Sequence, residues 1–107
     1  IPTAIQNYRV FAYIFQGYWE DIGTIGAFFD ANLNLTDPKP QYSFYEAGRP
    51  IYTRPRFLPA TIIRKATVDH AVISDGCLLE ECTIERCVIG LRSIVRRGSI
   101  LRNTIMM

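Results

Sequence analysis

The stretch "AVISDGCLLEECTIERCVIG", residues 71–90, decides the fold, because aliphatic residues recur in it at steps of five or six. The series extends to both sides and runs Val68, Ile73, Leu79, Ile84, Ile89, Val95, Ile100 and Ile105. Two positions before each member stands a small or compact residue: Ala66, Ala71, Cys77, Cys82, Cys87, Ser93, Gly98 and Asn103. Neither a 3.6-residue helix nor a hairpin array, which needs turn dipeptides, fits this spacing.

Successive steps of 5, 5 and 6 close a coil of 16 residues, so each aliphatic position recurs one coil later. The three predicted columns are Ile63–Leu79–Val95, Val68–Ile84–Ile100 and Ile73–Ile89–Ile105. Short strands that stack such columns inward are typical of a parallel β-helix with hexapeptide-like repeats. The sequence therefore predicts that fold from about residue 62 onward.

Charged residues repeat with the same period of 16. One column is Arg64, Glu80 and Arg96, and the other is Lys65, Glu81 and Arg97. Stacked strands lie about 4.8 Å apart, so opposite charges should meet across neighbouring coils. Each exposed pair is worth only about 0–1 kcal/mol, so the columns favour register more than stability.

Three cysteines and one histidine in the repeat region invite a chemical interpretation. Cys77, Cys82 and Cys87 are five residues apart, whereas zinc ligands usually come in pairs two to four apart. They share the small-residue slot, so buried packing is favoured over a metal site or a disulfide. The odd count without a secretion signal indicates a reducing compartment.

His70 could be a general base, as in hexapeptide-repeat acyltransferases, but a lone His is favoured as a surface residue. At a period of 16 it shares a column with Arg86 and Arg102, which predicts a weakly basic stripe. A solvated face is the favoured interpretation of that stripe.

The first 36 residues show a different pattern. Tyr8–Phe15, "YRVFAYIF", is rich in aromatic and β-branched residues and predicts a buried strand. "TIGAFFDANLNL" predicts a helix that Thr24 caps. The apolar face of that helix comprises Ile25, Phe28, Phe29 and Leu33. Five prolines then occur between residues 37 and 61, which predicts an extended linker.

Composition sets the class of molecule. The 107 residues are 49% hydrophobic and 12% aromatic, which is typical of a folded protein and excludes disorder. A net charge of +2 gives no indication of nucleic-acid or membrane binding. The chain opens with Ile-Pro and closes with the apolar "NTIMM", so we expect it to be part of a longer protein.

"GYWEDIGTI", residues 17–25, carries the only Trp of the chain beside two acids. In extended backbone, neighbouring side chains point to opposite sides, so Trp19 and Asp21 should share one face and Glu20 the other. A single Asp beside an indole, just before a helix, suits a Mg²⁺–phosphate site, since Mg²⁺ keeps water and phosphate oxygens as its other ligands. An Asp that only caps the following turn is the alternative, and the residues alone leave both open.

"GYWEDIGTIGAFFDANLNL", "YSFYEAGRPIYTRPRFLP" and "CVIGLRS" resemble the ADP-glucose pyrophosphorylase (glucose-1-phosphate adenylyltransferase) family along essentially the whole chain. That family has a Rossmann-like catalytic domain followed by a left-handed β-helix. The resemblance implies an α/β remnant of the catalytic domain in residues 1–36, a linker in 37–61 and β-helix coils in 62–107. It also implies that Asp21 helps to hold Mg²⁺ and that Trp19 lies near the sugar phosphate.

The resemblance implies an activity, namely the formation of ADP-glucose and pyrophosphate from ATP and glucose 1-phosphate for glycogen or starch synthesis. The family's Gly-rich nucleotide loop, its sugar-phosphate lysine and its second metal carboxylate have no counterpart in this sequence. We therefore expect the chain alone to be inactive. Rival interpretations are another sugar-1-phosphate nucleotidyltransferase, a non-catalytic β-helix assembly module and, least favoured, a hexapeptide acyltransferase.

Regulation and assembly follow from the same resemblance. Family members are tetramers that respond to phosphorylated metabolites or related anions. Arg54 and Arg56 lie in the linker and could bind such an anion, although they could equally brace the linker or form salt bridges. The resemblance implies a bacterial cytoplasm, or a plastid for a plant source.

Overall fold

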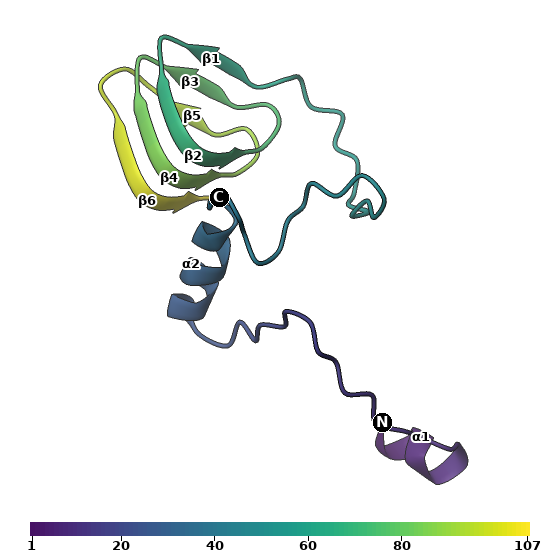
Figure 1. The fold of residues 1–107 in the computed structure, drawn as a ribbon. Helices are drawn as coiled ribbons and strands as arrows, with labels where there is room; N and C mark the ends of the chain where they lie inside the picture. The colour runs from purple at the N-terminus through teal and green to yellow at the C-terminus, as the bar shows by residue number, and fades with distance from the viewer.

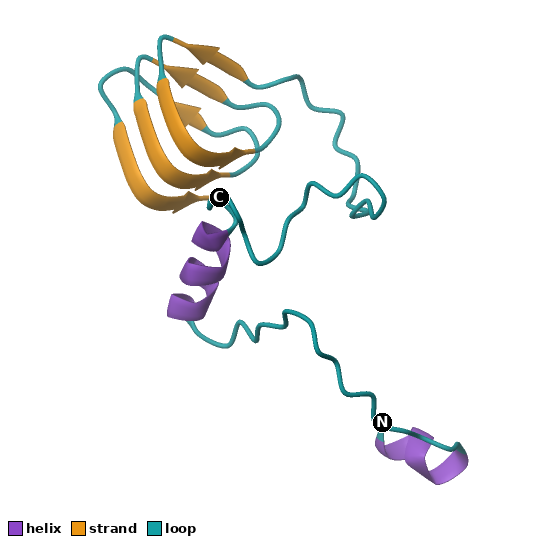
Figure 2. Cartoon of the chain, in the orientation of Figure 1, coloured by secondary structure: helices purple, strands orange, loops and turns teal.

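The computed structural model describes residues 1–107 and contains two short helices and six strands (Figures 1 and 2). The helices are α1 (Pro2–Asn7) and α2 (Ile25–Asn34). The strands are β1 (Ile62–Arg64), β2 (Thr67–Ile73), β3 (Leu78–Glu80), β4 (Thr83–Ile89), β5 (Ile94–Val95) and β6 (Ile100–Met106). Neither helix is both long enough and apolar enough to cross a membrane.

The six strands form a β-helix of three coils (Figure 1). Parallel pairing joins β1, β3 and β5 in one sheet and β2, β4 and β6 in another. The three long strands bend at residues with positive φ, namely His70 (46°), Arg86 (51°) and Asn103 (44°). Each long strand therefore wraps around a corner of its coil, and the predicted β-helix is present.

The predicted aliphatic columns fill the interior of the middle coil. Leu79, Ile84 and Ile89 are fully buried, and the three cysteines pack beside them in one cluster. Ile63 of the first coil points into the same column but is 50% exposed, because β1 is the outer strand of its sheet and no coil covers it. Burial in the middle coil confirms the predicted inward slots there.

The third coil departs from the predicted period. β2 pairs with β4 at an offset of 16 residues, whereas β4 pairs with β6 at an offset of 17, as in Ile84–Leu101. The predicted inward places of Ile100 and Ile105 are therefore wrong. Leu101 and Met106 take these places, and Ile100 is 64% exposed.

The extra residue lies in the corner between β5 and β6. There Gly98 has a φ of 80° and the N–H of Ser99 donates to the carbonyl of Arg96 at 3.1 Å. The matching corner of the middle coil turns at Glu81, with a φ of 46°. Two adjacent aliphatic residues follow the longer corner, so spacing alone could not show which one points inward. The last two small-residue slots shift from Gly98 and Asn103 to Ser99 and Thr104.

The charge columns are present in part. Arg64 pairs with Glu80 at 2.7 Å and Arg97 with Glu81 at 3.0 Å, as predicted. The predicted partners on the other side of each acid, Arg96 and Lys65, form no ion pair with them. Each acid thus bridges one neighbouring coil rather than two.

The predicted basic stripe is wrong at its last member. Arg102 lies opposite Glu85, with which it pairs at 3.0 Å, because of the extra residue in the third coil. His70 pairs with Asp69 at 2.8 Å, and Arg86 donates to Asn103 at 3.2 Å. Each member has a polar partner at the surface, which agrees with a solvated face.

Residues 8–15 do not form the predicted strand, and their aromatic side chains are exposed. A buried strand needs neighbouring strands that satisfy its backbone groups. The only sheets of this chain belong to the β-helix, and neither includes this segment. A Rossmann-like remnant is therefore not visible as a sheet.

α2 begins as predicted, since the Thr24 hydroxyl accepts the N–H of Ala27 at 3.1 Å. The helix contacts β4 and β6, and Leu33 near its end is buried. Ile25, predicted on the buried face, is instead exposed at the first turn. Residues 35–61 contain no helix or strand, as expected for a Pro-rich segment. α2 is thus the main element that joins the N-terminal part to the β-helix.

Candidate functional site

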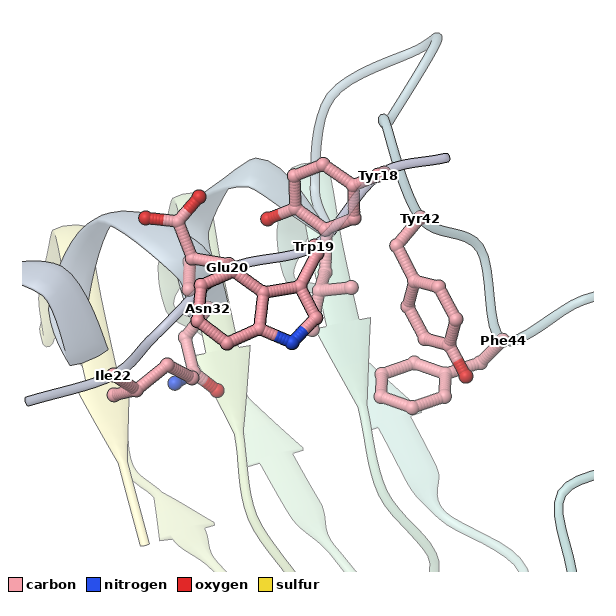
Figure 3. Close-up of a pocket in the computed structure, with 9 residues that line it drawn as sticks. Tyr18, Trp19, Glu20, Ile22, Asn32, Tyr42 and Phe44 are labelled. Carbon is pink, nitrogen blue, oxygen red and sulfur yellow. The ribbon is translucent and has the colours of Figure 1, made fainter. Parts of the chain in front are cut away.

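An open groove of about 390 Å³ lies where the segment before α2, the helix and the linker meet (Figure 3). It is mostly apolar, and we call it the Trp19 groove. Its nine lining residues are Tyr18, Trp19, Glu20, Ile22, Ala31, Asn32, Leu35, Tyr42 and Phe44. Glu20 supplies the only carboxylate and Asn32 the only amide of a wall that is otherwise apolar and aromatic and includes the hydroxyl groups of Tyr18 and Tyr42. Aromatic faces with a few polar groups suit a ligand that has both apolar and hydroxylated surfaces.

The linker contributes two aromatic rings to the Trp19 groove. The rings of Tyr42 and Phe44 meet edge to face, with centroids 5.4 Å apart and an angle of 86° between planes. Figure 3 shows them on one side of the indole of Trp19, with Glu20 and Asn32 on the other. Asn32 is fixed by its own helix, because its amide donates to the carbonyl of Phe28 at 2.8 Å.

Asp21 is exposed and is not among the lining residues of the Trp19 groove. Trp19 and Glu20, which were predicted on opposite faces, line the groove together, because this segment is irregular rather than a flat strand. Thr24 is the N-cap of α2, so Asp21 does not fill that position. No three His, Cys, Asp or Glu side chains of the chain come together as a metal site.

The two linker arginines line a second cavity, of about 410 Å³, which we call the linker crevice. Its walls are Thr53, Arg54, Pro55, Arg56, Ser74, Asp75 and Leu91. Neither arginine forms an ion pair, which speaks against the salt-bridge interpretation. The linker thus holds two free guanidinium groups against the turn that follows β2.

The thiols and His70 contribute to neither cavity. All three cysteines are buried and free, as predicted for packing residues. Burial raises the pKa of the Cys82 thiol, against the smaller opposing effect of backbone hydrogen bonds at Cys82 and Glu80. A thiol held in its protonated form is a poor metal ligand and nucleophile.

Two comparisons with known proteins bear on this geometry. Residues 56–107 match the family model of the GLGC left-handed parallel β-helix domain. Over its whole length, the chain is 49% identical to the glucose-1-phosphate adenylyltransferase small subunit, chloroplastic/amyloplastic, of Triticum aestivum, across 109 positions. The chain is a homologue of glucose-1-phosphate adenylyltransferase. It spans 23% of the length of that relative.

The two cavities lie in different parts of the sequence that is similar to glucose-1-phosphate adenylyltransferase. The matched β-helix domain begins at Arg56, so the linker crevice lies at its start. The Trp19 groove lies before that domain, in the part of the chain that the similarity to the wheat protein also covers. The three coils described above are therefore left-handed coils of the GLGC type.

Sequence reasoning missed several residues that line these cavities. Tyr42 and Phe44 are two positions apart, which is the spacing that places side chains on one side of an extended segment. That spacing could have indicated that the two rings lie on one side of the linker. A Pro-rich linker, however, does not by itself indicate that its side chains line a cavity. Ser74 and Asp75 gave no signal, because the turn that carries them meets Arg54 only through the folded path of the linker.

Proposed function

We propose that the chain is part of an enzyme that transfers an adenylyl group from ATP to glucose 1-phosphate, giving ADP-glucose and pyrophosphate for glycogen or starch synthesis. The observation that carries the proposal is the 49% identity to the wheat adenylyltransferase subunit, in a match that covers the whole chain, the segment of Trp19 and Asp21 as well as the β-helix. Transfer of this kind depends on positioning and charge neutralisation, with little covalent work for side chains. The chain alone is proposed to be inactive.

We assign residues 1–36 to the end of a Rossmann-like catalytic domain, 37–61 to the interdomain linker and 62–107 to the β-helix domain. The exposed aromatic residues of 8–15 support the first assignment. Contiguous apolar side chains of this kind are rarely left in water, so a larger catalytic domain would bury them.

Asp21 is the residue that would hold Mg²⁺. Its carboxylate is exposed and has no ion pair, and oxygen is the ligand that Mg²⁺ prefers. The ion, when bound, would neutralise charge on the phosphates. Trp19 would lie beside the sugar phosphate, where its groove would exclude water from one side of the site.

Arg54 and Arg56 are the residues that would bind a phosphorylated effector in the linker crevice. Paired guanidinium groups bind phosphate through short, charge-assisted hydrogen bonds. The single acid of the crevice, Asp75, leaves an excess of positive charge there.

A tetramer is the proposed assembly, and nucleic acid and membranes are not proposed as partners. The wheat relative is chloroplastic/amyloplastic by name, so we propose a plastid for a plant source and the cytoplasm for a bacterial one.

The catalytic proposal is tested by Asp21→Asn in the longer enzyme that contains this chain. A neutral amide is a poor Mg²⁺ ligand, and loss of a group that merely orients a metal ligand already costs about 10–100-fold. We expect turnover to fall by more than about 100-fold with the fold intact. Asp30→Asn is the matched control, because Asp30 is exposed on α2 and lines neither cavity, so it should cost much less. Equal losses from the two variants would contradict the assignment of Asp21.

The effector proposal is tested by replacing Arg54 and Arg56 together with Ala in the same enzyme. The concentration of phosphorylated effector that gives half-activation should rise, while turnover without effector should change little. Arg49→Ala is the control, because Arg49 lies in the same linker but pairs with Glu46 at 3.6 Å. An unchanged half-activating concentration in the double variant would assign the two arginines to a structural role.

A further inference from the structure

The last part of the linker is hydrogen-bonded to the β-helix through one side chain. Residues 50–61 take part in no backbone–backbone hydrogen bond, and Thr61 is the only one of them whose side chain forms a hydrogen bond. Its half-buried hydroxyl donates to the carbonyl of Ser74 at 2.6 Å and accepts the N–H of Cys77 at 3.2 Å. A hydroxyl group can fill both roles at once. Thr61 therefore bonds to both ends of the turn between β2 and β3.

An apolar contact joins the linker to the same turn. Leu58 is half-buried and lies over Gly76, because a Cβ added to Gly76 would be 3.5 Å from the Cβ of Leu58. Gly76 has a φ of 76°, which a residue with a side chain rarely adopts, so the turn keeps a bare Cα beneath Leu58. The linker thus meets the turn at two points, Leu58 and Thr61.

This turn also contributes Ser74 and Asp75 to the linker crevice, opposite Arg54 and Arg56. We propose that Thr61 is a positioning residue of the crevice, whose hydroxyl fastens the linker to the turn and so keeps both arginines facing it. The meaning of this role rests on the proposed effector function of the arginines. A site that is open for only part of the time binds its ligand more weakly by that fraction, so a loosened linker should weaken effector binding.

Trypsin can measure the attachment, because the linker contains a single bond that it cuts. Lys39, Arg49 and Arg54 are each followed by proline, after which trypsin does not cleave, and only the Arg56–Phe57 bond is left. Cleavage requires the residues after the bond to enter the protease in extended form, so Leu58 must first leave the turn. The rate of cleavage therefore follows the fraction of chains in which the linker is detached.

Thr61→Val keeps the shape of the side chain and removes the hydroxyl. In the 107-residue chain, we expect the Arg56–Phe57 bond to be cut about 5–30-fold faster, the factor for the loss of two ordinary hydrogen bonds. Thr61→Ser keeps the hydroxyl and should restore the wild-type rate. Thr53→Val is the matched control, because Thr53 lies in the same linker and forms no hydrogen bond, so its rate should stay unchanged.

Cleavage within the β-helix separates detachment of the linker from general unfolding. The Arg86–Cys87 bond lies in β4, the middle strand of its sheet, and should be cut as slowly in Thr61→Val as in the wild type. Equal acceleration at that bond would overturn the proposal, because Thr61 would then support the whole β-helix. A wild-type rate at Arg56–Phe57 in Thr61→Val, or the same gain in Thr53→Val, would overturn it as well.

The longer enzyme that contains this chain tests the link to regulation. In Thr61→Val, the half-activating concentration of a phosphorylated effector should rise by up to the factor seen in cleavage, with turnover in the absence of effector little changed. An unchanged value, alongside a raised one in the double variant of Arg54 and Arg56, would overturn the positioning role and leave the effector function standing. Faster cleavage in Thr61→Val, with normal activation in the double variant, would remove the effector function and leave the attachment by Thr61 standing.

Discussion

The 17-residue third coil makes a prediction that separates two neighbouring isoleucines. Ile84 is fully buried and stacks between Val68 of the first coil and Leu101 of the third. Ile100 would have held the place of Leu101 under a strict period of 16. The structure instead leaves Ile100 on the surface, so Ile84→Ala and Ile100→Ala should differ greatly in their cost to stability.

The magnitudes follow from burial. Replacement of a fully buried Ile by Ala costs about 2–5 kcal/mol, and neighbours fixed above and below prevent the cavity from closing, so we expect about 3–4 kcal/mol for Ile84→Ala. Full burial of an aliphatic side chain is worth about 1.5–3 kcal/mol. Ile100 has only about a third of its surface buried, so Ile100→Ala should cost less than about 1 kcal/mol.

Urea titration followed by far-UV circular dichroism measures both costs. With a urea m-value of about 1–3 kcal/mol/M, a difference of about 3 kcal/mol separates the two midpoints by roughly 1–3 M. Leu101→Ala is the reciprocal variant and should cost more than Ile100→Ala. A cost for Ile100→Ala equal to that for Ile84→Ala would show that Ile100 points inward and would refute the longer coil.

Three further predictions concern single side chains of the β-helix. Burial raises the pKa of Cys82 above its ordinary 9.0, so above that pH the unfolded chain holds fewer protons than the folded chain. The free energy of unfolding should therefore fall as pH rises. Urea titrations at pH 8 to 10 should show a weaker pH dependence of this free energy in Cys82→Ala. Lys65 has a φ of 48°, so Lys65→Gly should stabilise by about 0.5–1 kcal/mol, whereas Lys39→Gly, at a residue without positive φ, should not. Glu80→Gln removes the exposed pair with Arg64 and should cost less than about 1 kcal/mol, with the difference disappearing at 1 M salt.

The β-helix could be predicted from the sequence because its interior imposes a simple rule on every coil. An inward slot accepts an aliphatic residue, and the slot two places before it accepts only a compact one, as at Leu79 and Cys77. The rule fails where two adjacent residues satisfy it equally, as Ile100 and Leu101 do. Only the hydrogen bonds of the corner before them decide between the two, and these depend on the backbone rather than on side-chain pattern.

The N-terminal part was harder to predict. Strand propensity describes how well the residues of a segment suit a β-sheet, but a strand also needs neighbouring strands with which to pair. Tyr8–Phe15 has that propensity, but no strand of this chain lies beside it. The resemblance picked out Trp19 and Asp21 as site residues, and their roles stay proposals. The position of Tyr42 and Phe44 beside Trp19 depends on how the linker folds back, and local sequence does not encode that path.

The longer corner between β5 and β6 also bears on how this fold can change during evolution. Loss of one residue there would leave Leu101 five places after Val95, which is the ordinary step of the repeat, and every later side chain would keep its orientation. Loss of one residue within β4 would instead turn the following side chains inside out. Insertions and deletions among related chains should therefore concentrate at such corners, and lineages can vary in coil length while the interior stays the same.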